Sequence, residues 1–428
     1  MVYEFGAFAL DARARTVTLD GRLVLLTPKA VDTLLALVEQ QGRVVTRAQM
    51  LEAVWPGQFV EDGVLSVNVA LLRKALEAAG LPREAIETVP RRGYRFVPDV
   101  RRVALPAPPA RESVSPVARR LYLEGRHFWA KRTETALAKA AECFEAAVAE
   151  DPDYARAHAG LADTYLGIGI LPPADAMPRA KAAAQRAIAL DPTLGEAYAS
   201  LGRVLMAFEW DWDGAGRAFG RAIGLSPQYA TAHQWYANWL AATGRTNDAV
   251  VRIREAQQID PISLSVSAGA GFLLYMARRF DEAVTEYQRV IEMDGTFAVG
   301  YREMAMVLAQ LQRHQDALTA IDRALAFGPA NAVTAALRAQ ILALAGDRRG
   351  ARAQLAQLAS RADDIHLLPQ LFAATSVALG EWDAAWRWLR LALERRCYTL
   401  IWLKVDPWFD AVRTDARFAA SLTRIGLA

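Results

Sequence analysis

Residues that end helices recur at a nearly constant interval through most of this chain. The dipeptides Asp191-Pro192, Ser226-Pro227, Asp260-Pro261, Asp294-Gly295 and Gly328-Pro329 mark these positions, and the intervals between them are 35, 34, 34 and 34 residues. Proline has no amide hydrogen and clashes with the preceding helical turn, so these dipeptides predict the ends of helices. A fixed interval of this length restricts the fold strongly, because one small helical unit must then repeat and stack against its own copies.

Apolar residues keep fixed places within three of these intervals. Before Pro227, Pro261 and Pro329, alanine stands 12 and 5 residues earlier, and a larger apolar residue stands 8 earlier. These residues are Ala215, Phe219 and Ala222, then Ala249, Ile253 and Ala256, then Ala317, Ile321 and Ala324. Small side chains allow two helices to approach closely, and the larger side chain fills the space between neighbouring units.

A two-helix unit of 34 residues resembles the tetratricopeptide repeat (TPR). The resemblance implies an all-α superhelical solenoid of about eight repeats over residues 118–396, with capping helices in residues 397–428. The second repeat is longer than the others, and we expect residues 171–178 to form an extended loop between its helices. Residues 101–117, rich in proline and arginine, are predicted to be a linker.

The first helices of TPR units line a concave groove, which is the expected place for a partner. Aromatic, amide and cationic residues at the groove positions suit a protein partner that binds as an extended peptide, or a small polar effector. The repeat period places these residues there: Arg203, Gln234, Asn238, Phe272, Tyr275, Arg302, Met306 and Gln340.

The first hundred residues have a different pattern. Leu65, Val69, Leu72 and Leu76 are spaced by four, three and four residues, which places them on one face of a helix over residues 62–78. Two short strands should follow, at 85–89 and 94–97, joined by a turn of sequence Pro-Arg-Arg-Gly. A helix followed by a strand pair with arginines at its tip is typical of proteins that read DNA.

These residues resemble the DNA-binding domain of the OmpR/PhoB family. The resemblance is carried by Glu61-Asp62, by Leu-Leu-Arg-Lys-Ala-Leu at 71–76 and by Glu-Thr-Val-Pro-Arg-Arg-Gly-Tyr-Arg-Phe at 87–96. It implies an α+β winged helix-turn-helix domain over residues 1–100, in which helix 62–78 is the recognition helix and the strand pair is the wing. An N-terminal antiparallel sheet from residues 2–11 and 16–26 completes the expected fold.

The resemblance also implies double-stranded DNA as a partner and a dimer on tandem half-sites. Residues 55–60 stand where the family has a loop that contacts RNA polymerase or a neighbouring subunit. On the recognition helix, Ser66 and Asn68 can read base edges, and Val67 is suited to thymine methyl groups. Arg73 and Lys74 are suited to phosphates. The full set of candidate DNA-binding residues is Ser66, Val67, Asn68, Ala70, Leu71, Arg73, Lys74, Arg91 and Arg92.

Charge leaves a second interpretation open. Residues 1–100 contain 12 Lys and Arg against 12 Asp and Glu, and Ala70 and Leu71 stand where many members of the family have arginine. The winged helix could therefore bind protein instead of DNA, and the chain would then be a TPR interaction scaffold. Otherwise it is a sequence-specific transcriptional regulator with a TPR sensor, an arrangement that resembles the HilA-type regulators.

Composition excludes several other classes. The net charge is only +3, and Cys143 and Cys397 lie far apart, a usage that fits the reducing cytoplasm. No stretch is long and apolar enough to predict a membrane helix. The five histidines are scattered without metal-ligand spacing, and no phosphate-binding glycine loop occurs. We therefore expect a protein that is not an enzyme and has no metal or cofactor.

Overall fold

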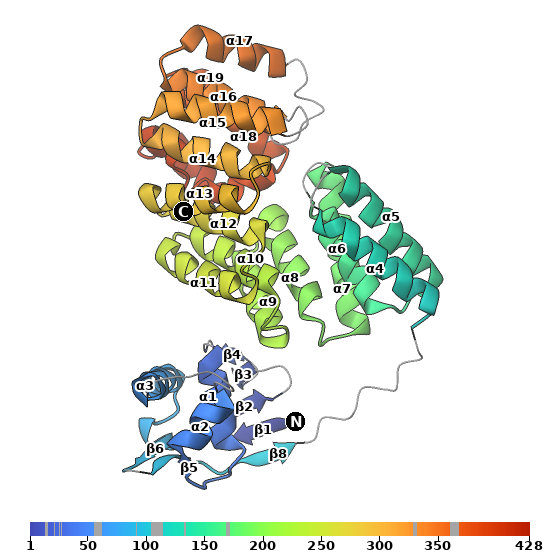
Figure 1. Cartoon of the computed structure of the whole chain (residues 1–428), viewed down its shortest axis with the longest axis vertical. Helices are drawn as coiled ribbons and strands as arrows, with labels where there is room; N and C mark the ends of the chain where they lie inside the picture. The colour runs from blue at the N-terminus through green and yellow to red at the C-terminus, as the bar shows by residue number, and fades with distance from the viewer. Residues whose placement is uncertain are drawn as a thin grey trace. The chain divides into compact units, whose positions relative to one another are not determined.

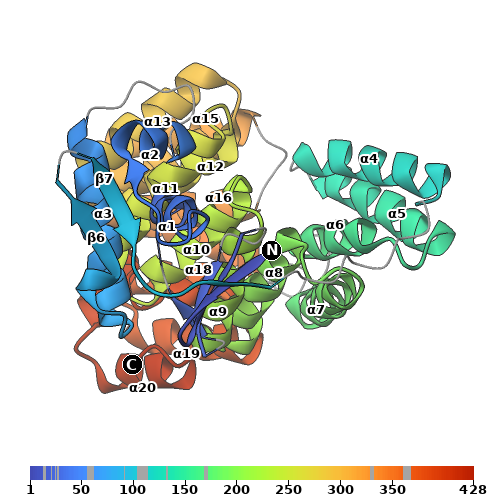
Figure 2. The same ribbon diagram turned by 90° about the horizontal axis from the view of Figure 1, so that it is seen from below.

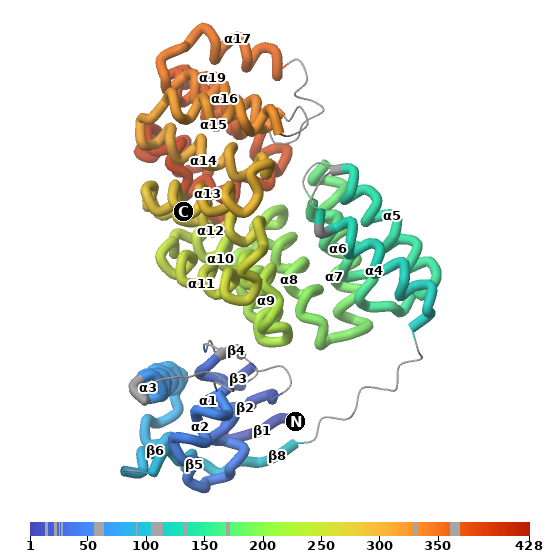
Figure 3. Tube along the Cα trace, in the orientation of Figure 1, coloured from blue at the N-terminus to red at the C-terminus, as the bar shows by residue number. Residues whose placement is uncertain are grey.

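The computed structural model describes residues 1–12, 16–20, 22–24, 26, 28–54, 62–90, 92–103, 114–131, 134–167, 172–327, 332–359 and 368–428. The chain divides into two compact units, the first formed by residues 1–114 and the second beginning at Ser115 (Figures 1 and 3).

The first unit begins with an antiparallel sheet of order β4-β3-β2-β1-β8. Its strands are β1 (Val2–Phe5), β2 (Phe8–Asp11), β3 (Thr16–Leu19), β4 (Arg22–Val24) and β8 (Arg101–Val103). The linker was predicted to begin at residue 101, and here the structure differs. β8 pairs with β1, and the Arg102 guanidinium donates a hydrogen bond of 2.6 Å to the Glu39 carbonyl and lies 5.6 Å from the ring centre of Tyr3.

Three helices and a second sheet complete the first unit. The helices are α1 (Pro28–Val38), α2 (Arg47–Val54) and α3 (Asp62–Ala78), and a 3₁₀ turn, η1 (Arg83–Ala85), follows them. The second sheet contains β5 (Val45–Thr46), β6 (Ile86–Val89) and β7 (Gly93–Phe96) in the order β5-β7-β6. Strands β6 and β7 form the hairpin that corresponds to the expected wing.

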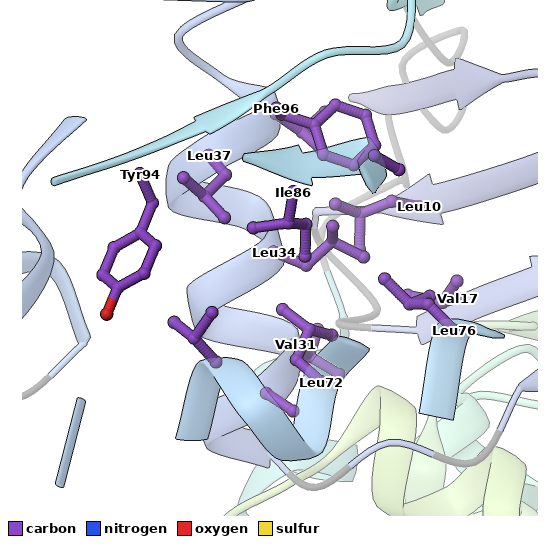
Figure 4. Packing of buried hydrophobic residues seen from close by; sticks show 14 of the residues in the cluster. Leu10, Val17, Val31, Leu34, Leu37, Leu72, Leu76, Ile86, Tyr94 and Phe96 are labelled. Atoms are coloured by element: carbon purple, nitrogen blue, oxygen red, sulfur yellow. The ribbon is translucent and has the colours of Figure 1, made fainter. Parts of the chain in front are cut away.

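One hydrophobic core holds these elements together. Leu65, Val69, Leu72 and Leu76 of α3 are all at most 2% exposed. They belong to the same cluster as Leu34 of α1, and Figure 4 shows Leu72 and Leu76 among the buried residues of that cluster. Burial of four large aliphatic side chains, each stabilising by about 1.5–3 kcal/mol, fixes which face of α3 turns inward. The expected α+β winged-helix fold is confirmed.

The second unit contains eight consecutive helix pairs within its described residues. They are α4 (Pro116–Ala130) and α5 (Glu134–Glu150), α6 (Ala155–Tyr165) and α7 (Pro173–Leu190), α8 (Gly195–Val204) and α9 (Trp212–Leu225), α10 (Ala230–Ala242) and α11 (Thr246–Ile259), α12 (Leu264–Met276) and α13 (Phe280–Met293), α14 (Ala298–Gln310) and α15 (His314–Phe327), α16 (Ala332–Leu344) and α17 (Arg348–Ala359), and α18 (Leu368–Ala378) and α19 (Trp382–Glu394). A π-helical turn, η2 (Leu205–Glu209), extends α8. The helical solenoid is therefore confirmed as the fold of this unit.

Packing in the second unit follows the pattern read from the sequence. The large residues Phe219, Ile253 and Ile321 are fully buried, and their alanine partners 12 and 5 residues before each proline are at most 3% exposed. Glycine also serves this close packing, because a Cβ atom at Gly202 would lie 2.8 Å from the ring of Phe219. No helix among the described residues is long and apolar enough to cross a membrane.

Two segments of the second unit differ from the sequence-based expectation. Helix α7 already begins at Pro173, so most of the loop expected at 171–178 is helical. Pro173 stands in the first turn, where its missing amide hydrogen has no helical acceptor, and Pro178 lies inside the helix. The expected capping helices at 397–428 are two 3₁₀ turns, η3 (Tyr398–Trp402) and η4 (Pro407–Val412), and one helix, α20 (Ala416–Arg424) (Figure 2). These elements do not stack on the last helix pair alone.

Candidate functional site

The face of α3 that points away from the core is apolar for most of its length. Val64, Val67 and Leu71 are 46%, 60% and 54% exposed, and Lys74 is exposed one turn further on. Their spacing of three, four and three residues makes them neighbours along one side of the helix. We call these four residues the outer face of α3; Ser66 and Ala70 flank it and are also exposed.

The structure corrects the role of Asn68. Its side chain is 7% exposed and points toward α1, where Nδ2 donates hydrogen bonds to the Lys29 carbonyl at 3.1 Å and to the Thr33 hydroxyl at 2.6 Å. An amide committed to two buried acceptors is not available to a base edge. Asn68 was predicted to read bases, and it instead fixes α3 on α1.

Arg73 also has a structural role that the sequence did not reveal. Its Nε and Nη2 atoms donate to the Ile86 carbonyl at 3.0 and 2.6 Å, and Nη2 donates to the Thr88 hydroxyl at 2.7 Å. Partial burial lowers the pKa of this guanidinium. Arg73 was predicted to bind phosphate, but these contacts use it to attach strand β6 of the wing to α3.

The wing carries an exposed cation close to its tip. Arg92 is exposed, whereas Arg91 lies outside the described residues. On the strands, Arg95 and Glu87 face each other at 2.8 Å, with both side chains 43% exposed, so this ion pair contributes little stability. Lys74 and Arg92 are therefore the predicted phosphate-binding residues that the structure leaves exposed.

Gly93 fixes how the wing begins its second strand. A Cβ atom at this position would lie 1.9 Å from the Val45 carbonyl oxygen, and the backbone φ of +153° is unfavourable for other residues. The absence of a side chain lets β7 pair with β5 at Thr46. This pairing anchors the hairpin that carries Arg92 to the body of the first unit.

Sequence reasoning missed two residues of this surface. Val64 continues the outer face of α3 by one turn, and its spacing of three residues from Val67 could have identified it. Thr88 exposes a side chain on the wing whose hydroxyl is positioned by Arg73. No local pattern could have identified Thr88, because its orientation depends on a contact across 15 residues of sequence.

The predicted groove residues have several different environments. Tyr275 and Gln340 are fully buried, and Phe272 packs edge-on against Trp402 with ring centres 4.9 Å apart. Desolvation raises the pKa of the Tyr398 hydroxyl to about 12, and the nearby guanidinium groups of Arg203 and Arg302 oppose this shift. Gln234 donates a hydrogen bond of 3.1 Å to the Ser265 carbonyl, while Asn238 and Met306 are partly exposed. Three of the eight residues, Arg203, Phe272 and Arg302, thus lie near the chain beyond residue 396.

A winged helix followed by a TPR-like solenoid defines the class of this protein. Residues 21–96 match the family described as "Transcriptional regulatory protein, C terminal". They form an OmpR/PhoB-type domain, as the residues at 61–62, 71–76 and 87–96 predicted.

The chain spans about two fifths of the length of the curated relatives it matches here, and those matches cover the first unit. The chain is 35% identical over 94 residues to the phosphate regulon transcriptional regulatory protein PhoB of Pseudomonas aeruginosa, and the match covers 22% of this chain and 40% of PhoB. It is 40% identical over 93 residues to the transcriptional regulatory protein PrrA of Mycobacterium tuberculosis, over 22% of this chain and 39% of PrrA. Among solved structures, that of pilF from Pseudomonas aeruginosa is 21% identical and covers 55% of this chain and 98% of pilF, with a TM-score of 0.40.

Proposed function

We propose that this protein is a sequence-specific DNA-binding transcriptional regulator whose TPR unit binds a protein partner or a small effector. The first unit would place the outer face of α3 in a major groove and the wing tip on the phosphate backbone. The observation that carries this proposal is that α3 and the wing, attached to each other through Arg73, expose Lys74 and Arg92. Both units then act by binding rather than by catalysis.

The apolar character of the outer face limits how sequence could be read. Val67 and Leu71 offer no hydrogen bonds, so contact with thymine methyl groups is the direct recognition they can provide. Affinity would then come mainly from phosphate contacts, which also set the register of the protein on DNA. Binding as a dimer on tandem half-sites fits a single short reading helix, because a second copy doubles the sequence that is read.

The test is a selection of bound DNA fragments with the full-length protein at low salt, followed by salt titration on the best fragment. The plot of log K against log salt has a negative slope, and the double variant Lys74→Ala/Arg92→Ala should reduce the magnitude of this slope by about 1.8, because two phosphate contacts are lost. The matched control Arg289→Ala/Arg349→Ala removes two exposed arginines from α13 and α17 and should leave the slope unchanged. Equal slopes for wild type and both double variants would reject the proposed DNA contacts.

One observation favours a second function, in which the winged helix binds protein. Three neighbouring aliphatic side chains on α3 are about half exposed, and such patches are common at protein interfaces. Under this interpretation, Val67→Ser/Leu71→Ser would abolish the interaction with a protein partner, and no DNA fragment would be enriched.

Contact with RNA polymerase through residues 55–60 is part of the proposal that the protein is a DNA-binding regulator. These residues lie outside the described part of the chain.

A further inference from the structure

The chain reverses direction after α19. Arg396 has a left-handed backbone with φ of +49°, and residues 397–428, which we call the C-terminal segment, follow it. The side chain of Arg396 lies over the rings of Phe208 and Trp210, 5.3 and 4.7 Å from their centres, and donates a hydrogen bond to the Phe208 carbonyl. The chain is thereby returned from the eighth helix pair to the third.

The first part of the C-terminal segment contacts the first helices of several repeats. Trp402 packs edge-on against Phe272 of α12, and the Thr399 hydroxyl donates to the amide oxygen of Gln370 on α18. Tyr398 is partly buried, and its removal from water raises its pKa to about 12. Its neighbours Arg203 and Arg302 belong to α8 and α14 and are among the residues assigned to the groove.

Polar contacts fix the second part. Arg278, just beyond the end of α12, donates to the Val405 carbonyl at 2.6 Å and pairs with the Asp410 carboxylate at 2.8 Å. Near the end of the chain, the Ile425 carbonyl accepts a hydrogen bond of 2.6 Å from the indole of Trp212 in α9. The C-terminal segment therefore contacts residues of, or directly beside, α8, α9, α12 and α18.

The positions of these contacts identify the occupied surface. Phe272, a groove residue of a first helix, packs against Trp402 of the C-terminal segment, and the groove residues Arg203 and Arg302 lie close enough to Tyr398 to oppose the rise of its pKa. The groove thus already holds a chain segment, and its contacts show what it recognises. The groove binds an indole ring against Phe272, and it binds a backbone carbonyl and a following carboxylate at Arg278.

We propose that the C-terminal segment is an intramolecular ligand of the groove, and that a protein partner binds by displacing it with a segment of the same chemistry. That chemistry is a tryptophan or similar aromatic residue followed by a carboxylate. The proposal deepens the function proposed for the TPR unit and rests on the groove being its partner site. It does not depend on DNA binding by the first unit.

Two features allow the segment to leave without unfolding the repeats. Its turns η3 and η4 are 3₁₀ helices, whose short hydrogen-bonded runs depend on outside contacts for stability. The Arg278–Asp410 pair is 36% and 50% exposed, so water can replace each partner at little cost. The buried side chains of the segment oppose its release, and they include Leu400, Ile401 and Phe409. A displacing partner must bury equivalent apolar groups.

Hydrogen exchange on the full-length wild-type protein tests whether the segment opens separately. Amides of η3 and η4 should exchange through an opening that leaves α12 and α14 protected, since local openings need less free energy than global unfolding. Exchange of the segment only together with these helices would overturn the proposal. A domain-swapped dimer, in which the segment of each wild-type copy occupies the groove of the other, would also overturn the proposal.

A synthetic fluorescent peptide of residues 397–415 tests recognition. In the full chain, Trp402→Ala should speed exchange of the segment and raise the affinity for the added wild-type peptide about 10-fold or more, because the tethered copy loses its packing on Phe272 while the peptide keeps it. The control Trp382→Ala removes a tryptophan of α19 that is 46% exposed, and it should behave as wild type. Loss of the repeat helices in Trp402→Ala, or peptide binding that is equal in all three proteins, would show that the segment is a permanent part of the fold.

Discussion

Arg73 offers the sharpest test of how the first unit is built. Its guanidinium makes three hydrogen bonds to β6, two to the Ile86 carbonyl and one to the Thr88 hydroxyl. Hydrogen bonds to charged groups contribute about 1.5–3 kcal/mol each when buried, and less when water can replace them. Because this site is only partly buried, we expect Arg73→Ala to lower the free energy of unfolding of the first unit by about 2 kcal/mol in total.

The assay compares two neighbouring cations. A loss of about 2 kcal/mol corresponds to a fall of roughly 10 °C in the melting temperature of a domain of this size. Arg73→Lys keeps the charge but cannot reproduce the forked geometry, so it should lose most of this stability too. Lys74→Ala should leave the melting temperature unchanged and lower the salt slope of DNA binding by about 0.9.

The opposite pattern would refute this reasoning. If Arg73→Ala melted like wild type and lowered the salt slope as Lys74→Ala does, the guanidinium would be a phosphate contact. Faster hydrogen exchange confined to β6 and β7 in Arg73→Ala would support its role in attaching the wing.

Three further predictions follow from single residues. Gly93→Ala should separate β7 from β5, because its Cβ would meet the Val45 carbonyl; hydrogen exchange at β7 checks this, and wild-type protection would contradict it. Asn68→Ala should destabilise the first unit by about 1–3 kcal/mol without changing the selected DNA motif, and a changed motif would restore its base-reading role. Burial raises the pKa of Asp406 from 3.8 to about 7, so the docked segment should lose stability as pH rises through this range. The free energy of opening of the segment, obtained from exchange rates corrected for the intrinsic rate at each pH, should therefore be lower at pH 8 than at pH 5, and Asp406→Asn should remove the difference; an opening free energy that is independent of pH in the wild type would contradict the assignment. The charged and titratable groups around this carboxyl are Tyr275, Arg278, Asp410 and Arg413.

The sequence was sufficient where structure depends on local periodicity. The spacing of Leu65, Val69, Leu72 and Leu76 defined both the helix and its buried face, since residues three and four apart share one side of a helix. The same reasoning identified Phe219 as a residue buried between helices of the repeats. Such patterns are complete within a few turns of chain and need no knowledge of distant partners.

The sequence could not predict the role of a side chain whose hydrogen-bond partner lies far away along the chain. Asn68 bonds to Thr33, 35 residues away, and Arg278 to Val405, 127 residues away. A polar residue on an amphipathic helix has the same local pattern whether it faces water, DNA or another strand. For this reason Asn68 and Arg73 were assigned to DNA, and the C-terminal segment was assigned to the end of the solenoid.

The C-terminal segment also changes what the TPR unit can do. A groove that already contains a tethered ligand has a lower apparent affinity for partners, in proportion to the fraction of molecules in which it is open. Partner binding would then be linked thermodynamically to release of residues 397–428. Any influence of this release on DNA binding would appear as a change in DNA affinity on addition of the partner.

The most direct test of the central claim is selection of bound genomic fragments with the full-length protein, followed by salt titration on the enriched sequence. We predict enrichment of a motif with two half-sites about one helical turn apart, and affinity that falls steeply with salt. Absence of any enriched sequence at low salt would contradict DNA recognition by α3 and the wing, and would favour a winged helix that binds protein.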